Sequence, residues 1–192
     1  MLPEVLSNGI CSLQEGQDRL VKSAFITYDA RGRVRETDLA NAVIRSSKRL
    51  TYAQAQSVVD GKPDPDLPDD VVALVRRMND LARIIHKRRY REGMLHLDLP
   101  DVELILDEDG RVTDARPEDT SFSHTIIEMF MVEANEAVAR KLAELNVPAL
   151  RRIHPEPEED DFNQLSTFVR ICGHTLPKTL DRFAMQKLLK NA

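Results

Sequence analysis

The chain has 192 residues, of which 42% are hydrophobic and 31% charged, and its formal net charge is −5. This composition is typical of a globular protein and excludes a disordered chain. No apolar run approaches the ~20 residues of a membrane span, and no basic segment followed by an apolar stretch marks a secretory signal. The two cysteines, Cys11 and Cys172, lie far apart and form no CxxC pair. Isolated thiols favour a reducing compartment, so we expect a cytoplasmic protein.

Charge is unevenly distributed along the chain. Residues 83–91 are strongly basic, whereas residues 156–161 are strongly acidic. The acidic balance argues against a protein that coats nucleic acid through bulk charge. A local basic groove remains compatible with it, because affinity for phosphate depends on where the cations lie.

The first half of the chain carries signals for a hairpin and two helices. Residues 29–32 supply a turn between two segments rich in β-formers, Thr51 is a candidate N-cap, and Asp69 and Asp70 place negative charge at a helix start. Gly93 is expected to close that helix. The expected elements are an irregular segment with a turn at 1–16, strands at 20–28 and 33–40 with 41–49 as a candidate extension, a short helix at 51–59, a loop at 60–70 and a long helix to about 91.

The second half changes period twice. Residues 94–99 alternate as a strand does, and Asp109-Gly110 is a strong hairpin signal. The elements expected after it are a long helix at 123–145, a loop or short strand at 148–157, a helix at 158–172 and another from 178. The apolar residues predicted to share the core face of the long helix are Ile127, Phe130, Met131, Ala134, Val138 and Leu142. The fold class expected is therefore α+β, with a mixed or antiparallel sheet and packed amphipathic helices.

Motifs for several kinds of chemistry are missing from the sequence. The histidines are scattered, with no HExxH and no ligand-spaced cysteines, so no zinc site is expected. No phosphate-binding glycine loop and no GxSxG occur. The acidic runs at 64–70 and 156–161 favour solvated loops that cap helices over metal sites, since the first lacks the glycine and closing glutamate of a calcium loop.

Residues 45–52, Arg-Ser-Ser-Lys-Arg-Leu-Thr-Tyr, are the best candidate for a binding site. Their cations and hydroxyls suit phosphates, and an aromatic ring suits a base. The alternative is a polar strand end and helix cap with Tyr52 half-buried. Glu128 and Asn135 lie seven residues apart on one helix face. Glu128 is either a structural acid or one that faces substrate, and spacing does not choose between them.

Four segments resemble the catalytic domain of the ribonuclease II / ribonuclease R exoribonucleases, in the same order. They are Met-Leu-Pro-Glu-Val-Leu-Ser-Asn-Gly-Ile-Cys-Ser-Leu at 1–13, Ala-Val-Ile-Arg-Ser-Ser-Lys-Arg-Leu-Thr-Tyr at 42–52, Ile-Glu-Met-Phe-Met-Val-Glu-Ala-Asn-Glu-Ala-Val-Ala at 127–139, and Pro-Ala-Leu-Arg-Arg-Ile-His-Pro at 148–155. The resemblance covers essentially the whole chain. One departure is Met129, where the family often has a second consecutive glutamate.

The resemblance implies a hydrolytic enzyme that degrades single-stranded RNA from its 3′ end to nucleoside 5′-monophosphates, with Mg²⁺ held by aspartates. The first segment resembles the stretch just after that aspartate cluster, so we expect residues 1–192 to be an internal piece, a partial RNB-type domain. The downstream Ser-Pro-Ile-Arg-Arg-Tyr kind of motif is absent from this sequence, and cold-shock and S1-like barrels have no room in it. No catalytic residue and no metal ligand of this chain is identified. The residues that the resemblance places near RNA are Arg45, Lys48, Arg49, Tyr52, Glu128, Asn135, Arg152 and His154.

Three functional hypotheses follow. The first is a segment of the exoribonuclease that supplies part of the RNA channel and is inactive alone. The second is a non-catalytic protein that binds RNA or a partner. The third is a fragment with no independent role. Oligomeric state is not predicted by any pattern in the sequence.

Overall fold

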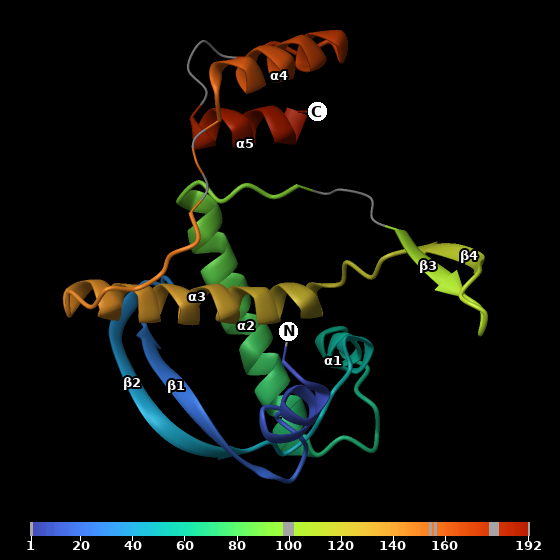
Figure 1. Cartoon of the computed structure of the whole chain (residues 1–192), viewed down its shortest axis with the longest axis vertical. Helices are drawn as coiled ribbons and strands as arrows, with labels where there is room; N and C mark the ends of the chain where they lie inside the picture. The colour runs from blue at the N-terminus through green and yellow to red at the C-terminus, as the bar shows by residue number, and fades with distance from the viewer. Residues whose placement is uncertain (1, 98–101, 154, 156, 177–180, 192) are drawn as a thin grey trace. The chain divides into compact units, whose positions relative to one another are not determined.

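Figure 1 shows the computed structural model of the chain, which describes residues 2–97, 102–153, 155, 157–176 and 181–191. The fold is α+β, as expected, and its described strands form two antiparallel pairs. The elements in order are η1 (Val5–Ile10), β1 (Asp18–Tyr28), β2 (Val34–Arg45), α1 (Tyr52–Val59), α2 (Asp69–Arg91), β3 (Val102–Leu106), β4 (Val112–Pro117), α3 (Phe122–Glu144), α4 (Glu159–Ile171) and α5 (Arg182–Asn191). They form two compact units, one of Met1–Arg88 with Asp119–Val147 and one of Arg89–Glu118 with Pro148–Ala192.

The β1–β2 hairpin forms the antiparallel strand pair of the first unit. Its register pairs Asp18 with Arg45 at one end and Tyr28 with Val34 at the other, so the second strand extends to Arg45 and no further. The turn is organised by Asp29, which accepts the backbone N–H groups of Arg31 at 2.8 Å and Arg33 at 2.9 Å. These hydrogen bonds, that of Arg33 above all, lower the pKa of Asp29 to about 2. The hairpin was predictable from the sequence because its turn signal lies within a few consecutive residues.

Gly32 ends that turn where the hairpin meets α2. Its φ is +76°, and a Cβ there would lie 2.8 Å from Cγ2 of Ile84 and 3.3 Å from the Ile84 carbonyl oxygen. The side chain of Ile84 can rotate, but its carbonyl is fixed in the helix. Gly32 is therefore required both for its conformation and for its small size.

Replacing Gly32 with alanine is expected to lower the free energy of unfolding by ~1–3 kcal/mol, because positive φ and overpacking both cost stability. Urea unfolding followed by circular dichroism measures the change. Gly61→Ala is the matched control, since Gly61 in the same unit has φ +78° and no atom within 4 Å of the added Cβ. An equal loss in both variants would show that the contact with Ile84 contributes nothing.

Helices α1 and α2 begin at the predicted caps. Thr51 Oγ1 accepts the N–H of Gln54 at 3.2 Å, and Gln54 Oε1 accepts the N–H of Thr51 at 3.0 Å, which forms a capping box. Asp69 and Asp70 lie in the first turn of α2, where the helix dipole favours negative charge. The buried cluster between these helices consists of Val58, Leu67, Val72 and Val75.

The predicted core face of α3 is wrong by about one residue. The buried residues of this helix are Ser123, Ile126, Met129, Glu133 and Ala137. Ile127 is 40% exposed, Met131 58% and Val138 41%, although all three were expected in the core. Apolar residues lie nearly all round this helix, so their periodicity alone does not select the buried face. Two residues of the buried face, Ser123 and Glu133, are polar, so a search for apolar residues does not find this face.

Glu133 is buried because it has cationic and phenolic partners. Arg88 Nη2 donates to Glu133 Oε1, Arg88 Nη1 donates to the Gly32 carbonyl at 2.8 Å, and Tyr28 Oη donates to Glu133 Oε2 at 3.1 Å. Burial, followed by the negative charge of Glu133, raises the pKa of Tyr28. This network joins the hairpin, α2 and α3. In the sequence Arg88 stands out only as part of the basic run 83–91, and nothing local points to Glu133.

The second unit contains the β3–β4 hairpin and two helices. The Asp109-Gly110 hairpin is confirmed, with Val102 opposite Pro117. Helices α4 and α5 are confirmed, but the predicted start of α5 at 178 lies outside the described residues. Gln186 Nε2 donates to the carbonyls of Tyr90 and Met94, both at 2.7 Å, and so ties α5 to the last turn of α2 and to the segment that follows it.

Two other sequence predictions are corrected. The first residues were expected to be irregular, but Val5–Ile10 form a π-helix, η1, followed by a bend. Residues 94–97 were expected to form a strand, but they have no regular structure, and 98–99 lie outside the described residues. Alternation alone does not make a strand, because the backbone hydrogen bonds of a ladder require a second strand. None of the described helices is long and apolar enough to cross a bilayer.

Candidate nucleic-acid interface

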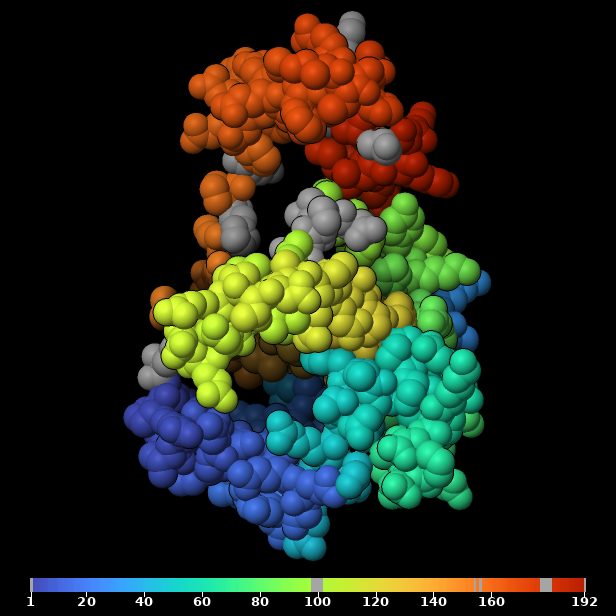
Figure 2. All heavy atoms as spheres, turned by 90° about the vertical axis from the view of Figure 1, so that its right-hand side faces the viewer, coloured from blue at the N-terminus to red at the C-terminus, as the bar shows by residue number. Residues whose placement is uncertain are grey.

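A groove of about 1140 Å³ in the first unit contains the best candidate site. It is lined by the end of β2, the segment that leads to α1, and one face each of α1, α2 and α3. The lining residues are Arg45, Ser46, Ser47, Lys48, Arg49, Leu50, Thr51, Tyr52, Ala55, Val71, Leu74, Val75, Met78, Ser123, Ile126 and Ile127. Residues 45–52 therefore contribute cations and hydroxyls to the groove, and α2 and α3 contribute mainly aliphatic side chains. Figure 2 shows the segment around residues 45–59, coloured cyan, at the surface.

Two cations of this groove, Arg45 and Lys48, pair with exposed acids. Arg45 Nε lies 2.7 Å from Asp18 Oδ1, and Lys48 Nζ lies 3.0 Å from Glu15 Oε1. The second oxygen of Glu15 accepts the N–H of Arg49 at 2.9 Å, and this bond with that from Lys48 lowers the pKa of Glu15. Surface ion pairs of this kind contribute only ~0–1 kcal/mol. Exchanging a carboxylate for an RNA phosphate therefore costs little.

Tyr52 presents the aromatic ring of the groove. It is the first residue of α1, its position is set by the Thr51 cap, and 43% of its surface is exposed. Its ring stacks on His124 of α3, with the ring centroids 3.7 Å apart and the planes 20° from parallel. The helix cap predicted at Thr51 is confirmed and Tyr52 lines an open groove, whereas contact of this segment with RNA stays a prediction.

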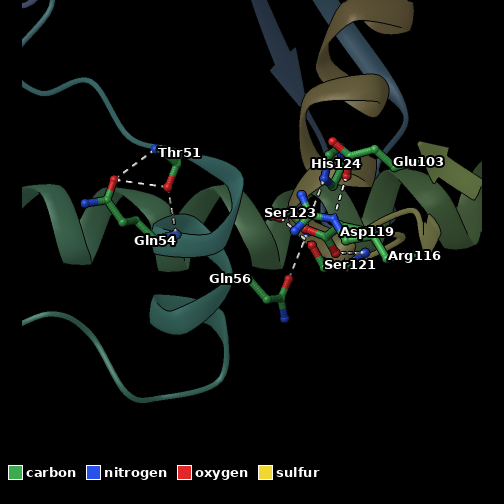
Figure 3. Close-up of polar contacts among 9 residues, drawn as sticks. All are labelled: Thr51, Gln54, Gln56, Glu103, Arg116, Asp119, Ser121, Ser123 and His124. Carbon is green, nitrogen blue, oxygen red and sulfur yellow. Dashed lines mark hydrogen bonds and ion pairs between the residues drawn. The ribbon is translucent and has the colours of Figure 1, made fainter. Parts of the chain in front are cut away.

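Hydrogen bonds fix the start of α3 beside α1 (Figure 3). Ser123 donates its backbone N–H to Gln56 Oε1 at 3.0 Å, and the hydroxyls of Ser121 and Ser123 lie 2.8 Å apart. Phe122 packs against α2, where the guanidinium carbon of Arg83 lies 4.1 Å from the ring centroid. The helix that forms one side of the groove is therefore anchored to both of its neighbours.

The structure brings together half of the residues predicted to face RNA. Arg45, Lys48, Arg49 and Tyr52 line one groove. Glu128 and Asn135 are exposed on α3 but do not line it. Arg152 is exposed in a segment of the second unit without regular structure, and His154 lies outside the described residues. Sequence reasoning missed His124 and Gln56, whose partners lie 72 (124 − 52) and 67 residues away along the chain, and Asp119, which contacts His124.

Metal-ligating side chains do not gather in the described part of the chain. No three His, Cys, Asp or Glu side chains there lie close enough together to hold an ion. The acidic loop before α2 instead serves local structure, since Asp64 Oδ1 accepts the N–H of Asp66 at 3.0 Å. The donor set described here does not fit a catalytic magnesium ion.

Comparison with known proteins decides the family. The sequence matches the RNB domain over residues 1–192. The chain belongs to the RNB domain family. It is 36% identical over 180 residues to ribonuclease R of Aquifex aeolicus, an alignment that covers 93% of this chain and 25% of that protein. It is 34% identical over 167 residues to the human exosome complex exonuclease RRP44, covering 86% of this chain and 17% of that one.

Solved structures agree with this assignment. The apo form of Mycoplasma genitalium RNase R matches with a TM-score of 0.92 at 28% identity, over 99% of this chain and 30% of that chain. The same TM-score is found for that enzyme in complex with ribose-methylated single-stranded RNA. The resemblance noted in the sequence is thereby confirmed. The chain spans about a quarter of the length of the curated ribonuclease R relatives it matches.

Proposed function

We propose that this RNB-domain chain supplies one wall of the RNA channel of a 3′-to-5′ exoribonuclease that hydrolyses single-stranded RNA to nucleoside 5′-monophosphates. The observation that carries the proposal is the groove in which Arg45, Lys48 and Arg49 face the same space as Tyr52. The relatives named ribonuclease R support the reaction, and a ribonuclease R bound to single-stranded RNA supports the ligand.

The chemistry of the groove suits a single strand. Cations on an extended segment contact successive phosphates without regard to sequence, and an aromatic ring stacks on any base. The aliphatic residues Leu74, Met78 and Ile126 offer an apolar wall to the faces of unstacked bases. Glu128, Asn135, Arg152 and His154 remain proposed RNA contacts outside this groove.

Catalysis is proposed to lie elsewhere in the enzyme. RNB-family hydrolysis implies Mg²⁺, and the described residues of this chain offer it no ligand set. We therefore propose that residues 1–192 bind RNA without cleaving it. A cytoplasmic location is part of the same proposal, supported by free thiols at Cys11 and Cys172.

Removing the groove cations is expected to lower the affinity for single-stranded RNA. It should also make that affinity less dependent on salt concentration. For the variant Arg45→Ala/Lys48→Ala/Arg49→Ala, the slope of log K against log salt should fall by up to ~2, since each phosphate contact contributes ~0.7. Fluorescence anisotropy of a labelled oligouridylate at several salt concentrations measures both quantities.

The matched control removes the same number of positive charges, three, from the second unit. Arg111, Arg170 and Lys190 are exposed and lie outside the groove. Arg111→Ala/Arg170→Ala/Lys190→Ala should leave the slope nearly unchanged. Equal losses of slope in the two triple variants would mean that binding follows overall charge and not this groove.

An exposed apolar surface favours a second candidate function, binding of a protein partner. Leu20 and Val43 face each other across the β1–β2 hairpin and are 89% and 62% exposed. Exposed apolar side chains that form a contiguous surface mark protein–protein contacts. A folded chain that binds no oligouridylate at low salt would favour this alternative over the RNA channel.

A further inference from the structure

We infer that His124 is a positioning residue, which holds the Tyr52 ring in the orientation that RNA meets, and that Asp119 in turn orients His124. The inference rests on the proposed RNA-binding role of Tyr52 and deepens it. Tyr52 lines the groove, whereas His124 does not. His124 therefore acts on RNA only through the tyrosine.

The stack on His124 constrains the side chain of Tyr52, whose backbone is fixed by the helix cap. The capping box at Thr51 fixes where Tyr52 begins, but the tyrosine ring still turns about two side-chain torsions. Within the described part of the chain, His124 is the one ring recorded in contact with it, at 3.7 Å between centroids and 20° between planes. Such a parallel arrangement covers one face of the tyrosine and selects one ring orientation.

His124 is itself held by a carboxylate. Its Nε2 lies 3.4 Å from Asp119 Oδ2, and Asp119 Oδ1 accepts the backbone N–H of Ser121 at 2.9 Å. The N–H and hydroxyl of Ser121 are the main cause of the lowered pKa of Asp119, with His124 adding to it. The carboxylate is thus an ionised, fixed acceptor for the imidazole. Figure 3 shows Asp119, Ser121 and His124 gathered at the start of α3.

The two helices that bear the rings are also tied together. The hydrogen bond from Ser123 N–H to Gln56 Oε1, at 3.0 Å, joins the residue before His124 to the middle of α1. Ser123 is 2% exposed, so the donor end of this bond is shielded from water. The stack is therefore a preformed part of the structure. A ring ordered before binding loses less conformational entropy when a base stacks on it.

The test is a double-mutant cycle on the full chain with a labelled oligouridylate. Tyr52→Ala should weaken binding by about 5- to 100-fold, the range of base–aromatic stacking. His124→Ala should weaken it by about 2- to 10-fold, the range for immobilising one side chain. His124→Phe keeps a ring but loses the contact with Asp119, so it should bind more tightly than His124→Ala and less tightly than the parent chain. In the Tyr52→Ala background, His124→Ala should change nothing.

Controls separate this effect from general damage. Tyr90 is 41% exposed, close to the value for Tyr52, and His96 is exposed, and both lie outside the groove. Tyr90→Ala and His96→Ala should bind RNA as the parent does. Multiplying losses in the Tyr52→Ala/His124→Ala double variant, or no rescue by phenylalanine, would overturn the inference.

A second measurement needs no RNA. In the free protein, the ring protons of Tyr52 experience the ring current of His124, so their NMR shifts should move in His124→Ala and stay in His96→Ala. Unmoved Tyr52 shifts in His124→Ala would sink the inference even if RNA binds. Moved shifts together with no RNA binding by the parent chain would sink the proposed function and leave the positioning role standing.

Discussion

Glu133→Ala is expected to lower the free energy of unfolding by ~3–5 kcal/mol, the largest effect of any single change considered for this chain. Glu133 is 1% exposed and Arg88 8% exposed, so the variant leaves a buried guanidinium without its carboxylate. It also removes the acceptor of the Tyr28 hydroxyl, which lies 3.1 Å from Glu133 Oε2. Urea unfolding monitored by far-ultraviolet circular dichroism measures the loss.

Two further variants separate the buried pair from a general effect on α3. Glu128→Ala changes an exposed glutamate of the same helix and should shift stability by no more than ~0.5 kcal/mol. Arg88→Met/Glu133→Leu replaces both charges by apolar groups and should recover much of the loss, since a buried ion pair is often replaceable as a unit. A Glu133→Ala chain as stable as Glu128→Ala would contradict the buried network.

Single-stranded RNA incubated with the chain in Mg²⁺ is expected to remain intact while it is bound. Metal-assisted in-line displacement requires acidic ligands that hold the ion at the scissile phosphate. The described residues offer no such group. A 5′-labelled oligouridylate resolved on a denaturing gel, beside an EDTA control, should show no shortening while anisotropy shows binding.

Contaminating nuclease is the main confounder of that experiment. Tyr52→Ala supplies the control, because a contaminant is indifferent to a substitution in this chain. Release of nucleoside 5′-monophosphates that requires Mg²⁺ and disappears in Tyr52→Ala would contradict the proposal that catalysis lies elsewhere.

Local signals predicted most of the helices and strands. The Thr51 cap, the acidic start of α2 and the Asp109-Gly110 turn each act within a few residues, and each lies where expected. The core face of α3 was not predictable in the same way. Glu133 is buried because Arg88, 45 residues away, and Tyr28, 105 residues away, meet it there. A pattern that counts apolar residues assigns a glutamate to solvent.

The residues of the candidate site also differ in how far they could be predicted from local sequence. Arg45, Lys48, Arg49 and Tyr52 were found because they are nearly consecutive, and one extended segment delivers them to one groove. His124 was dismissed as one of several scattered histidines, because its stacking partner lies on another helix. The basic run at 83–91 drew attention by composition, yet Arg88 within it serves a buried contact. Proximity in sequence revealed the wall of the groove but not what supports it.

Photocrosslinking tests the central claim, that RNA binds along residues 45–52, most directly. A single strand that carries 4-thiouridine would be irradiated with the full chain, and the modified peptides identified by mass spectrometry. The account predicts that the main crosslinks fall on the segment from Arg45 to Tyr52 and on the first turns of α3, and that they fall sharply in Arg45→Ala/Lys48→Ala/Arg49→Ala. Crosslinks confined to the second unit, with none on residues 45–52, would contradict it.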